Sequence, residues 1–323
     1  MGTWCIGIDL GGTNTKFGLL DGEGRPGPTL GLPTPTDRGS DGVVDRIVAG
    51  ARQLLHQAGL TNAQVCGVGI GAPGPLRIAE GVVVAMPNIP GMEDCALSGR
   101  VGEALHLPAV LENDANAAAY GEFIAGAGRT TRDMVMLTLG TGVGSGIIVD
   151  GRILHGSHEM GGELGHTIIV PDGEPCNCGQ RGCLERYCSA TYLAERTVRK
   201  VRSGQAATSL RAVLDSQGAL TARDIHQAVR AGDGLAKAAW EEGIHHLALG
   251  CVNICRILDP QKIVLSGGMT LAGEDLMAPL REHVARLHWT ITPIRTELAV
   301  ASLGTDAGVI GAAGVAWQAL RLP

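Results

Sequence analysis

The fold is decided by two similar stretches, IGIDLGGTNTKFGLLDGEG at residues 6–24 and MLTLGTGVGSGIIVDGRIL at residues 136–154. Each reads as an apolar strand, a glycine and threonine turn, a second apolar strand and an Asp-Gly turn. The two copies lie about 130 residues apart. This repeat predicts a duplicated α/β unit, with a nucleotide held in the cleft between the halves.

The first glycine turn has the composition of a phosphate-binding nest, because amides left unpaired between two strands can point at phosphate oxygens. Asp9 is predicted to hold hydrated Mg²⁺. The residues predicted to donate hydrogen bonds to the phosphates are Gly11, Gly12, Thr13, Asn14 and Lys16. No P-loop or dinucleotide-binding fingerprint occurs in this turn. A tight hairpin with polar residues is the alternative reading, and the repeat weighs against it.

Two further glycine turns extend the predicted nucleotide site. In the second copy of the repeat, Thr141, Gly142 and Gly144 occupy the turn. Farther along, Gly267 and Gly268 follow the apolar strand 263–265, where glycine would let a flat adenine or ribose approach the backbone closely. A plain strand-to-helix turn explains this last pair equally well.

A predicted strand at 109–111 ends in Glu112, Asn113 and Asp114, directly before a predicted helix. One interpretation is that Asp114 caps the helix, as aspartate commonly does. The other is that Asp114 is a catalytic base and Asn113 positions a substrate hydroxyl. The local sequence leaves both interpretations open.

The most specific chemistry lies in EMGGELGHTIIVPDGEPCNCGQRGCLERYC at residues 159–188. His166, Cys176, Cys178 and Cys183 form a Cys₃His set that suits tetrahedral Zn²⁺, and four protein ligands indicate a structural ion. A reduced surface loop or a disulfide is the alternative. Glu163, His166 and Glu185 would then project from a fixed frame, a pattern that favours a polyhydroxylated ligand.

Length and composition narrow the function classes. The 323 residues predict two domains. A net charge of -6 without a long basic run argues against nucleic acid as the main partner. We find no secretory signal and no apolar run long enough to span a membrane, so we expect a cytoplasmic protein with reduced cysteines.

The remaining pattern is of alternating strands and helices. Predicted helices cover residues 43–58, 97–107, 115–126, 190–202, 221–231, 235–257, 276–287 and 304–320. Further strands are predicted at 4–9, 17–20, 65–70, 82–85, 134–139, 147–149 and 297–301. We interpret the mixed, polar segment 203–220 as a surface excursion.

Taken together, DLGGTNTK, LENDANAA, GTGVGSG, ELGH, CNCGQRGCLE and VLSGG resemble the sugar kinases of the repressor, open reading frame, kinase (ROK) family, and among them the bacterial glucokinases. The resemblance implies an actin-like, ribonuclease-H-like α/β fold of two lobes with a cleft between them. We expect residues 1–115, rejoined by the helix in 304–323, to form the small lobe and residues 116–303 the larger one. The resemblance to this family also implies a homodimer.

The resemblance further implies ATP-dependent phosphorylation of a hexose at its 6-hydroxyl, with Mg²⁺ and a structural Zn²⁺. Asp114 matches the family's base and Asn113 its sugar-positioning neighbour. Glu163, His166 and Glu185 match the other sugar ligands, and Gly74 and Asn88 correspond loosely. Met92 departs from the tryptophan that is common in its loop. The alternatives are a kinase for N-acetylmannosamine, N-acetylglucosamine, allose or fructose, polyphosphate as donor, and a sugar-responsive repressor without its DNA-binding module.

Overall fold

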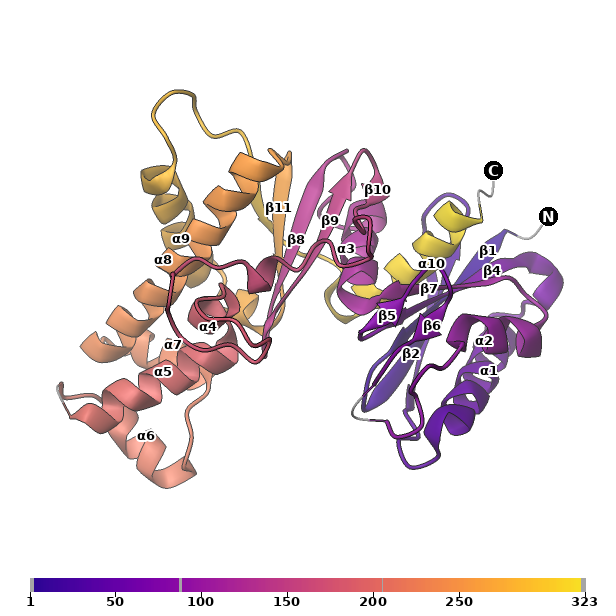
Figure 1. Ribbon diagram of the computed structural model, residues 1–323, viewed down its shortest axis with the longest axis horizontal. Coiled ribbons are helices and arrows are strands. Elements are labelled where there is room, and N and C mark those ends of the chain that lie inside the picture. Colours follow the sequence, from indigo (N-terminus) through magenta and orange to yellow (C-terminus); the bar gives the residue numbers. More distant parts are fainter. Residues whose placement is uncertain (1–2, 87–88, 205, 321–323) are drawn as a thin grey trace. The chain divides into compact units, whose positions relative to one another are not determined.

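The computed structural model describes residues 3–86, 89–204 and 206–320 (Figure 1). The chain forms two compact units. The first is built from the chain up to Arg132, from Gly146–Gly162 and from Ala301 onward, and the second from Asp133–Ser145 and Glu163–Val300. The segment 116–132, which the sequence analysis assigned to the larger lobe, groups with the first unit because the helix within it packs on the C-terminal helix.

The first unit contains a five-stranded sheet with the strand order β3-β2-β1-β4-β7. Its strands are β1 (Trp4–Leu10), β2 (Asn14–Asp21), β3 (Pro26–Pro33), β4 (Val65–Ala72) and β7 (Ala109–Asn113). The first three form an antiparallel meander, and β4 and β7 continue it in parallel with β1. Parallel strands place their carboxyl ends at one edge, so β1, β4 and β7 end on the same side.

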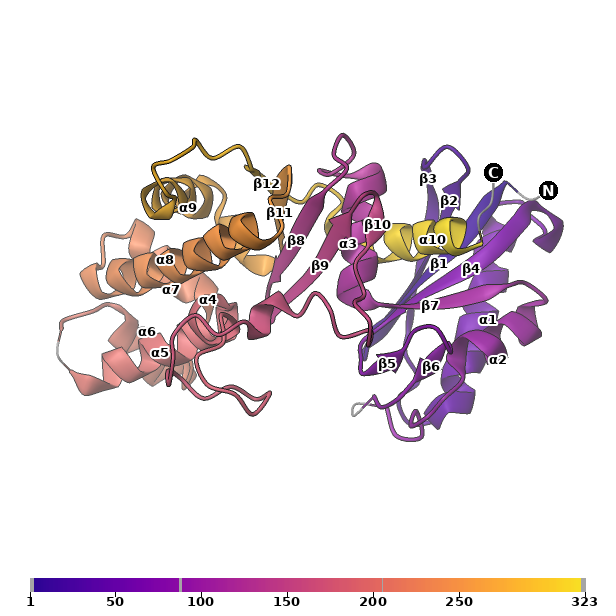
Figure 2. The ribbon, with the colours of Figure 1, turned by 45° about the horizontal axis from the view of Figure 1, so that its top comes forward.

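Each face of this sheet carries its own layer of helices (Figure 2). Ile6 and Ile8 belong to the core shared with α1 (Gly39–Gln57) and α2 (Leu97–Leu105). The alternate residues Cys5 and Gly7 face α10 (Ala307–Ala319), as the period of a strand requires. A Cβ on Gly7 would collide with the backbone of α10, so glycine lets this helix lie directly on the sheet. Helix α3 (Asp114–Ala125) packs beside α10.

The second sheet has the order β10-β9-β8-β11-β12. Its strands are β8 (Met134–Leu139), β9 (Val143–Val149), β10 (Arg152–Ile153), β11 (Lys262–Ser266) and β12 (Glu297–Val300). β8, β11 and β12 run parallel. The order matches that of the first sheet strand for strand, with the glycine-turn pair β8 and β9 in the place of β1 and β2. The repeat in the sequence therefore corresponds to a repeat in topology.

The second unit also contains α4 (Glu185–Cys188), α5 (Ala190–Ser203), α6 (Leu210–Gln217), α7 (Ala222–Arg230), α8 (Gly234–Ile257) and α9 (Glu274–Leu287). The first unit adds the short antiparallel pair β5 (Leu76–Arg77) and β6 (Val82–Val83). Short 3₁₀ turns occur at η1 (Asn62–Gln64), η2 (Leu164–His166), η3 (Gly268–Ala272) and η4 (Gly304–Asp306).

Most predicted elements are present with boundaries shifted by a few residues, and the differences have physical reasons. Helix α6 lies inside the segment interpreted as a surface excursion. It was not predicted because only its Leu210 and Leu214 are buried, and so short an apolar pattern does not indicate a helix. The final helix begins at Ala307, after the turn η4. Within the described residues, none of the helices has the length and apolar character that crossing a membrane requires.

Candidate functional site

The carboxyl end of β7 places Asn113 and Asp114 at the start of α3. The helix cap is Asn113, whose Oδ1 accepts the amides of Ala115 at 2.9 Å and Asn116 at 3.2 Å. The interpretation of Asp114 as the capping residue is therefore wrong. Asp114 is the first helical residue, and its Oδ1 accepts the Ala115 amide at 2.8 Å. Since the cap occupies Oδ1 of Asn113, its Nδ2 is the atom left to donate to a ligand.

The electrostatic environment of Asp114 differs from that of a surface acid. Burial raises the pKa of this carboxyl above its ordinary value, and the hydrogen bond that the Ala115 amide donates only partly opposes the shift. Burial also raises the pKa of Asp9 at the end of β1, and the negative charge of Asp114 adds to that shift. Two coupled carboxylates at one sheet edge form an environment that a cation would stabilise.

The first glycine turn connects β1 to β2 beside these acids. Gly11 donates its amide to the Asn14 carbonyl at 3.1 Å, and the Thr34 hydroxyl donates to the Gly11 carbonyl at 2.7 Å. Lys16, predicted to bind phosphate, donates through Nζ to the Thr305 carbonyl at 2.9 Å. Gly12 is half-buried and Thr13 is exposed, and so is Asn14. The turn is thus a fixed backbone loop whose tip is accessible.

Gly74 lies near Asn113 in the first unit. A Cβ placed on Gly74 would be 4.0 Å from Asn113 Nδ2, so the structure brings these two predicted sugar residues together. The peptide bond that follows Gly74 is cis. Asn88, the other residue carried over loosely, lies outside the described residues.

In the second unit, Glu185 joins the second glycine turn to the cysteine stretch. Its Oε2 accepts the Val143 amide at 3.0 Å, and its Oε1 is 4.0 Å from Cys176 Sγ. Gly142 lies directly against this carboxylate, so a side chain at this position would displace it. Thr141 is exposed, and Gly144 is half-buried. Glu163 is exposed just before η2, the turn that carries His166.

The four predicted metal ligands form one compact group. The ligand atoms of His166, Cys176, Cys178 and Cys183 all lie within 4.8 Å of one another. Cys178 and Cys183 have their Sγ atoms 3.6 Å apart, and Cys176 Sγ is 3.6 Å from His166 Nδ1. A tetrahedral ion with bonds of about 2.3 Å to sulfur and about 2.0 Å to nitrogen holds its ligand atoms about 3.5 to 3.8 Å apart. The side chains therefore fit a tetrahedral metal ion, whereas a disulfide needs sulfurs about 2.0 Å apart.

Gly267 and Gly268 lie at the carboxyl end of β11. Gly267 has φ of +89° and presses on the Leu139 backbone, so a side chain there would be both strained and crowded. Gly268 lines a cavity of about 150 Å³ together with Trp240, His226 and Met269. His226 and Trp240 are stacked with ring centroids 5.3 Å apart.

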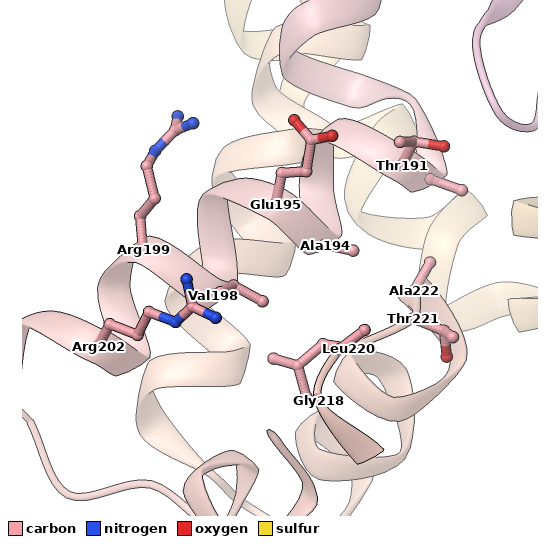
Figure 3. A pocket seen from close by; sticks show the side chains of 12 residues that line it. Thr191, Ala194, Glu195, Val198, Arg199, Arg202, Gly218, Leu220, Thr221 and Ala222 are labelled. Atoms are coloured by element: carbon pink, nitrogen blue, oxygen red, sulfur yellow. The ribbon is translucent and has the colours of Figure 1, made fainter. Parts of the chain in front are cut away.

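A larger cavity of about 570 Å³ lies between α5 and the start of α7. Figure 3 shows Ala194 and Val198 facing Leu220 across it, while the charged ends of Glu195 and Arg199 project away. The Ala190 amide at the start of α5 donates to the Gly140 carbonyl at 2.9 Å, so a residue that lines this cavity is hydrogen-bonded to the second glycine turn. Both cavities have Ala222 in their lining.

A family model described as the ROK family matches residues 5–319 of the chain. The chain belongs to the ROK family.

Curated and structural relatives agree with this membership. A glucokinase of Halalkalibacterium halodurans is 36% identical, with 95% of this chain and 93% of that protein covered. The crystal structure of a ROK hexokinase from Thermus thermophilus has a TM-score of 0.85 and 31% identity, covering 98% of this chain and 99% of that one. A ROK-family glucokinase of Streptomyces griseus, crystallised with glucose and AMPPNP, has a TM-score of 0.75 and 33% identity over 98% and 99% of the two chains. The ROK resemblance and the actin-like two-lobe fold are confirmed.

A partly buried contact beside Asp114, between Glu112 and His155, was not predicted from the sequence of this ROK-family chain. Glu112 has a side chain that is 1% exposed, and its Oε2 lies 2.7 Å from His155 Nε2. Its Oε1 accepts the Asn113 amide at 2.9 Å and the Asn116 side-chain amide at 3.0 Å. The pair joins the end of β7 to the segment after β10. Because the partners are 43 residues apart, no local pattern could have predicted it.

Protonated His155 should make the stability of this ROK-family protein depend on pH. The bond to Glu112 raises the pKa of His155 above its ordinary 6.5. The stabilisation is therefore full below about pH 6.5 and is lost as pH rises through the raised folded pKa. We expect urea unfolding to show a free energy of unfolding that falls over this range in wild type, with a flatter dependence in His155→Gln. His158→Gln, an exposed histidine in the same segment, is the control, and an unchanged pH slope in His155→Gln would contradict the assignment.

Proposed function

We propose that this protein is a hexose kinase that transfers the γ-phosphoryl group of ATP to the 6-hydroxyl of a hexose, with glucose as the preferred acceptor. The observation that carries the proposal is the partly buried carboxylate of Asp114 at the end of β7, next to Asn113 and electrostatically coupled to Asp9. The names of the relatives support it, since H. halodurans has a glucokinase and the S. griseus structure holds glucose with AMPPNP.

Asp114 is assigned as the general base. A sugar hydroxyl is a poor nucleophile at neutral pH, and its proton has to leave as the new phosphorus–oxygen bond forms. A carboxylate with a raised pKa accepts that proton more readily than an ordinary aspartate. Asn113 donates through Nδ2 to a neighbouring hydroxyl, and Gly74 presents backbone beside it. Glu163, His166 and Glu185 bind the remaining hydroxyls of the same sugar.

ATP is assigned to the two glycine turns. The transferred group carries most of the charge in a loose transition state, so backbone amides and Mg²⁺ supply much of the catalysis. Asp9 would hold hydrated Mg²⁺. We assign the adenosine to the cavities that border Ala222, where Gly268 leaves the backbone open beside the stacked His226 and Trp240.

The metal of the Cys₃His group is assigned as Zn²⁺ with a structural role. Its four ligands leave no position open for water, and they hold the turn η2, where His166 lies, next to the start of α4, where Glu185 lies. When bound, the ion would fix these two side chains and supply no step of the phosphoryl transfer. A homodimer and a cytoplasmic location stay predictions from the sequence.

Product analysis on a panel of sugars tests the proposed function. Purified protein is incubated with ATP or polyphosphate and with glucose, fructose, allose, N-acetylglucosamine or N-acetylmannosamine. We expect ADP release that depends on the sugar, the highest kcat/KM with glucose, and a 6-phosphate product. ATP turnover that no hexose stimulates would contradict the proposal, and a higher kcat/KM with an N-acetyl sugar would replace glucose as the substrate.

Gly142→Ala should weaken sugar use through Glu185. The added methyl group would occupy the position of the Glu185 carboxylate, a flexible group that can move away without disturbing the fold. We expect kcat/KM for glucose to fall roughly 10- to 100-fold, the order of effect that small misplacement of a binding group produces. The control is Gly140→Ala in the same turn, where a Cβ meets open space. Equal kinetics for the two variants would argue against Glu185 as a sugar ligand.

A further inference from the structure

Glu159 has an unusual backbone conformation in the segment that leads from β10 to Glu163. Its φ is +57°, in the left-handed region that residues with a Cβ rarely adopt. Such a conformation costs free energy and persists where surrounding contacts fix it. The position is not glycine, so its side chain is expected to make contacts that offset the cost.

Those contacts run to the turn between β5 and β6. Glu159 Oε2 accepts the Ile78 amide at 2.7 Å, and Oε1 accepts the Ala79 amide at 2.8 Å. Both oxygens of one carboxylate therefore bind consecutive backbone amides, and hydrogen bonds to an ionised group are stronger than neutral ones. The residues that it holds directly follow β5, which in turn follows Gly74 and its cis peptide bond.

The same segment is anchored a second time near Asp114. His155 pairs with Glu112 at 2.7 Å, and its carbonyl accepts the Gly161 amide at 2.8 Å. Segment 154–162 thus contacts both the end of β7 and the turn 76–80, all within the first unit. It links the backbone after Gly74 to the backbone around Asn113.

We propose that Glu159 is a positioning residue that sets sugar affinity by fixing the turn after Gly74 against segment 154–162. Glu159 acts through Ile78 and Ala79 and does not itself touch the sugar. This inference rests on the proposed hexose kinase function, because Gly74 and Asn113 are its proposed sugar contacts. It predicts a loss in sugar binding that exceeds any loss in the chemical step.

The test compares Glu159→Gly with His106→Gly. Both changes place glycine at a left-handed position of the first unit, and His106 is an exposed residue at the end of α2. We expect Glu159→Gly to raise KM for glucose roughly tenfold, as for the loss of charge-assisted bonds that orient a site, with kcat and KM for ATP within about twofold of wild type. Glu159→Gln keeps one acceptor oxygen and should recover part of the affinity.

Hydrogen exchange gives a second readout that needs no substrate. The amides of Ile78 and Ala79 should exchange at least about tenfold faster in Glu159→Gly than in wild type, and should be unchanged in His106→Gly. Unchanged exchange overturns the contact itself. Faster exchange with an unaltered glucose KM overturns its role in sugar binding. If the wild-type protein phosphorylates no hexose, both the proposed function and the role of Glu159 in sugar affinity are wrong. The hydrogen-exchange measurement still decides whether Glu159 holds the turn.

Discussion

Replacing Asp114 with asparagine is expected to lower kcat for glucose phosphorylation by roughly 10²- to 10⁴-fold, the contribution typical of a positioned general base. Asparagine has nearly the same shape and keeps an oxygen for the Ala115 amide, so the start of α3 should be preserved. Glucose should still bind, because the other proposed sugar contacts are intact. Steady-state kinetics and calorimetric titration with glucose separate these two effects.

The acid limb of the pH profile provides an independent check on this assignment. Because burial raises the pKa of Asp114 above its ordinary 3.8, the base becomes protonated at a higher pH than a surface aspartate would. Activity of wild type should therefore decline, as pH falls, before an ordinary carboxyl titrates. Asp9 titrates in the same environment, so the observed value belongs to the pair. Asp94→Asn, a change to an exposed acid of the same unit, should leave activity unchanged. Near-normal kcat in Asp114→Asn would reject Asp114 as the base.

Removal of the metal is expected to have the largest effect on stability. In small zinc domains, metal binding contributes roughly 10 to 16 kcal/mol, which exceeds the whole free energy of unfolding of many proteins. A strong chelator, or Cys176→Ala, should therefore unfold the 163–188 region and abolish activity together. Metal analysis should find one zinc per chain, and circular dichroism and activity should recover when zinc is returned to the chelated protein.

The control for this experiment is Cys66→Ala, which removes a half-buried thiol outside the Cys₃His group. It should leave both the metal content and the response to chelator unchanged. Fully active protein that contains no zinc would show that the group of four side chains has another role, and the proposed structural metal would be wrong.

Local sequence patterns were sufficient to predict the repeat and the cysteine group. The glycine turns, the strand before each and the spacing from His166 to Cys183 are all readable within a few tens of residues, so the duplicated unit and the four clustered side chains could be predicted. Strand β3 was not anticipated, because its burial is shallow and its prolines and glycines are typical of a loop. Thr34, directly after β3, donates its hydroxyl to the Gly11 carbonyl of the first glycine turn and was missed for the same reason.

Features that depend on distant partners could not be read from the sequence. Asn113 and Asp114 are both good capping residues, and only the three-dimensional structure shows that the asparagine takes the cap. Glu112 with His155, and Glu159 with Ile78 and Ala79, connect segments that are 43 to 81 residues apart. Met92, identified as a departure in the predicted sugar pocket, is fully buried in the core of the first unit.

The most direct test of the central claim is a crystal structure with glucose and a non-hydrolysable ATP analogue. The measurement is the distance between the Asp114 carboxylate and the 6-hydroxyl of the bound sugar. The account predicts hydrogen-bond distance, about 2.6 to 3.2 Å, with Glu163, His166 and Glu185 on other hydroxyls of the same molecule. A bound hexose whose 6-hydroxyl lies out of reach of Asp114, directly or through one water, would contradict it.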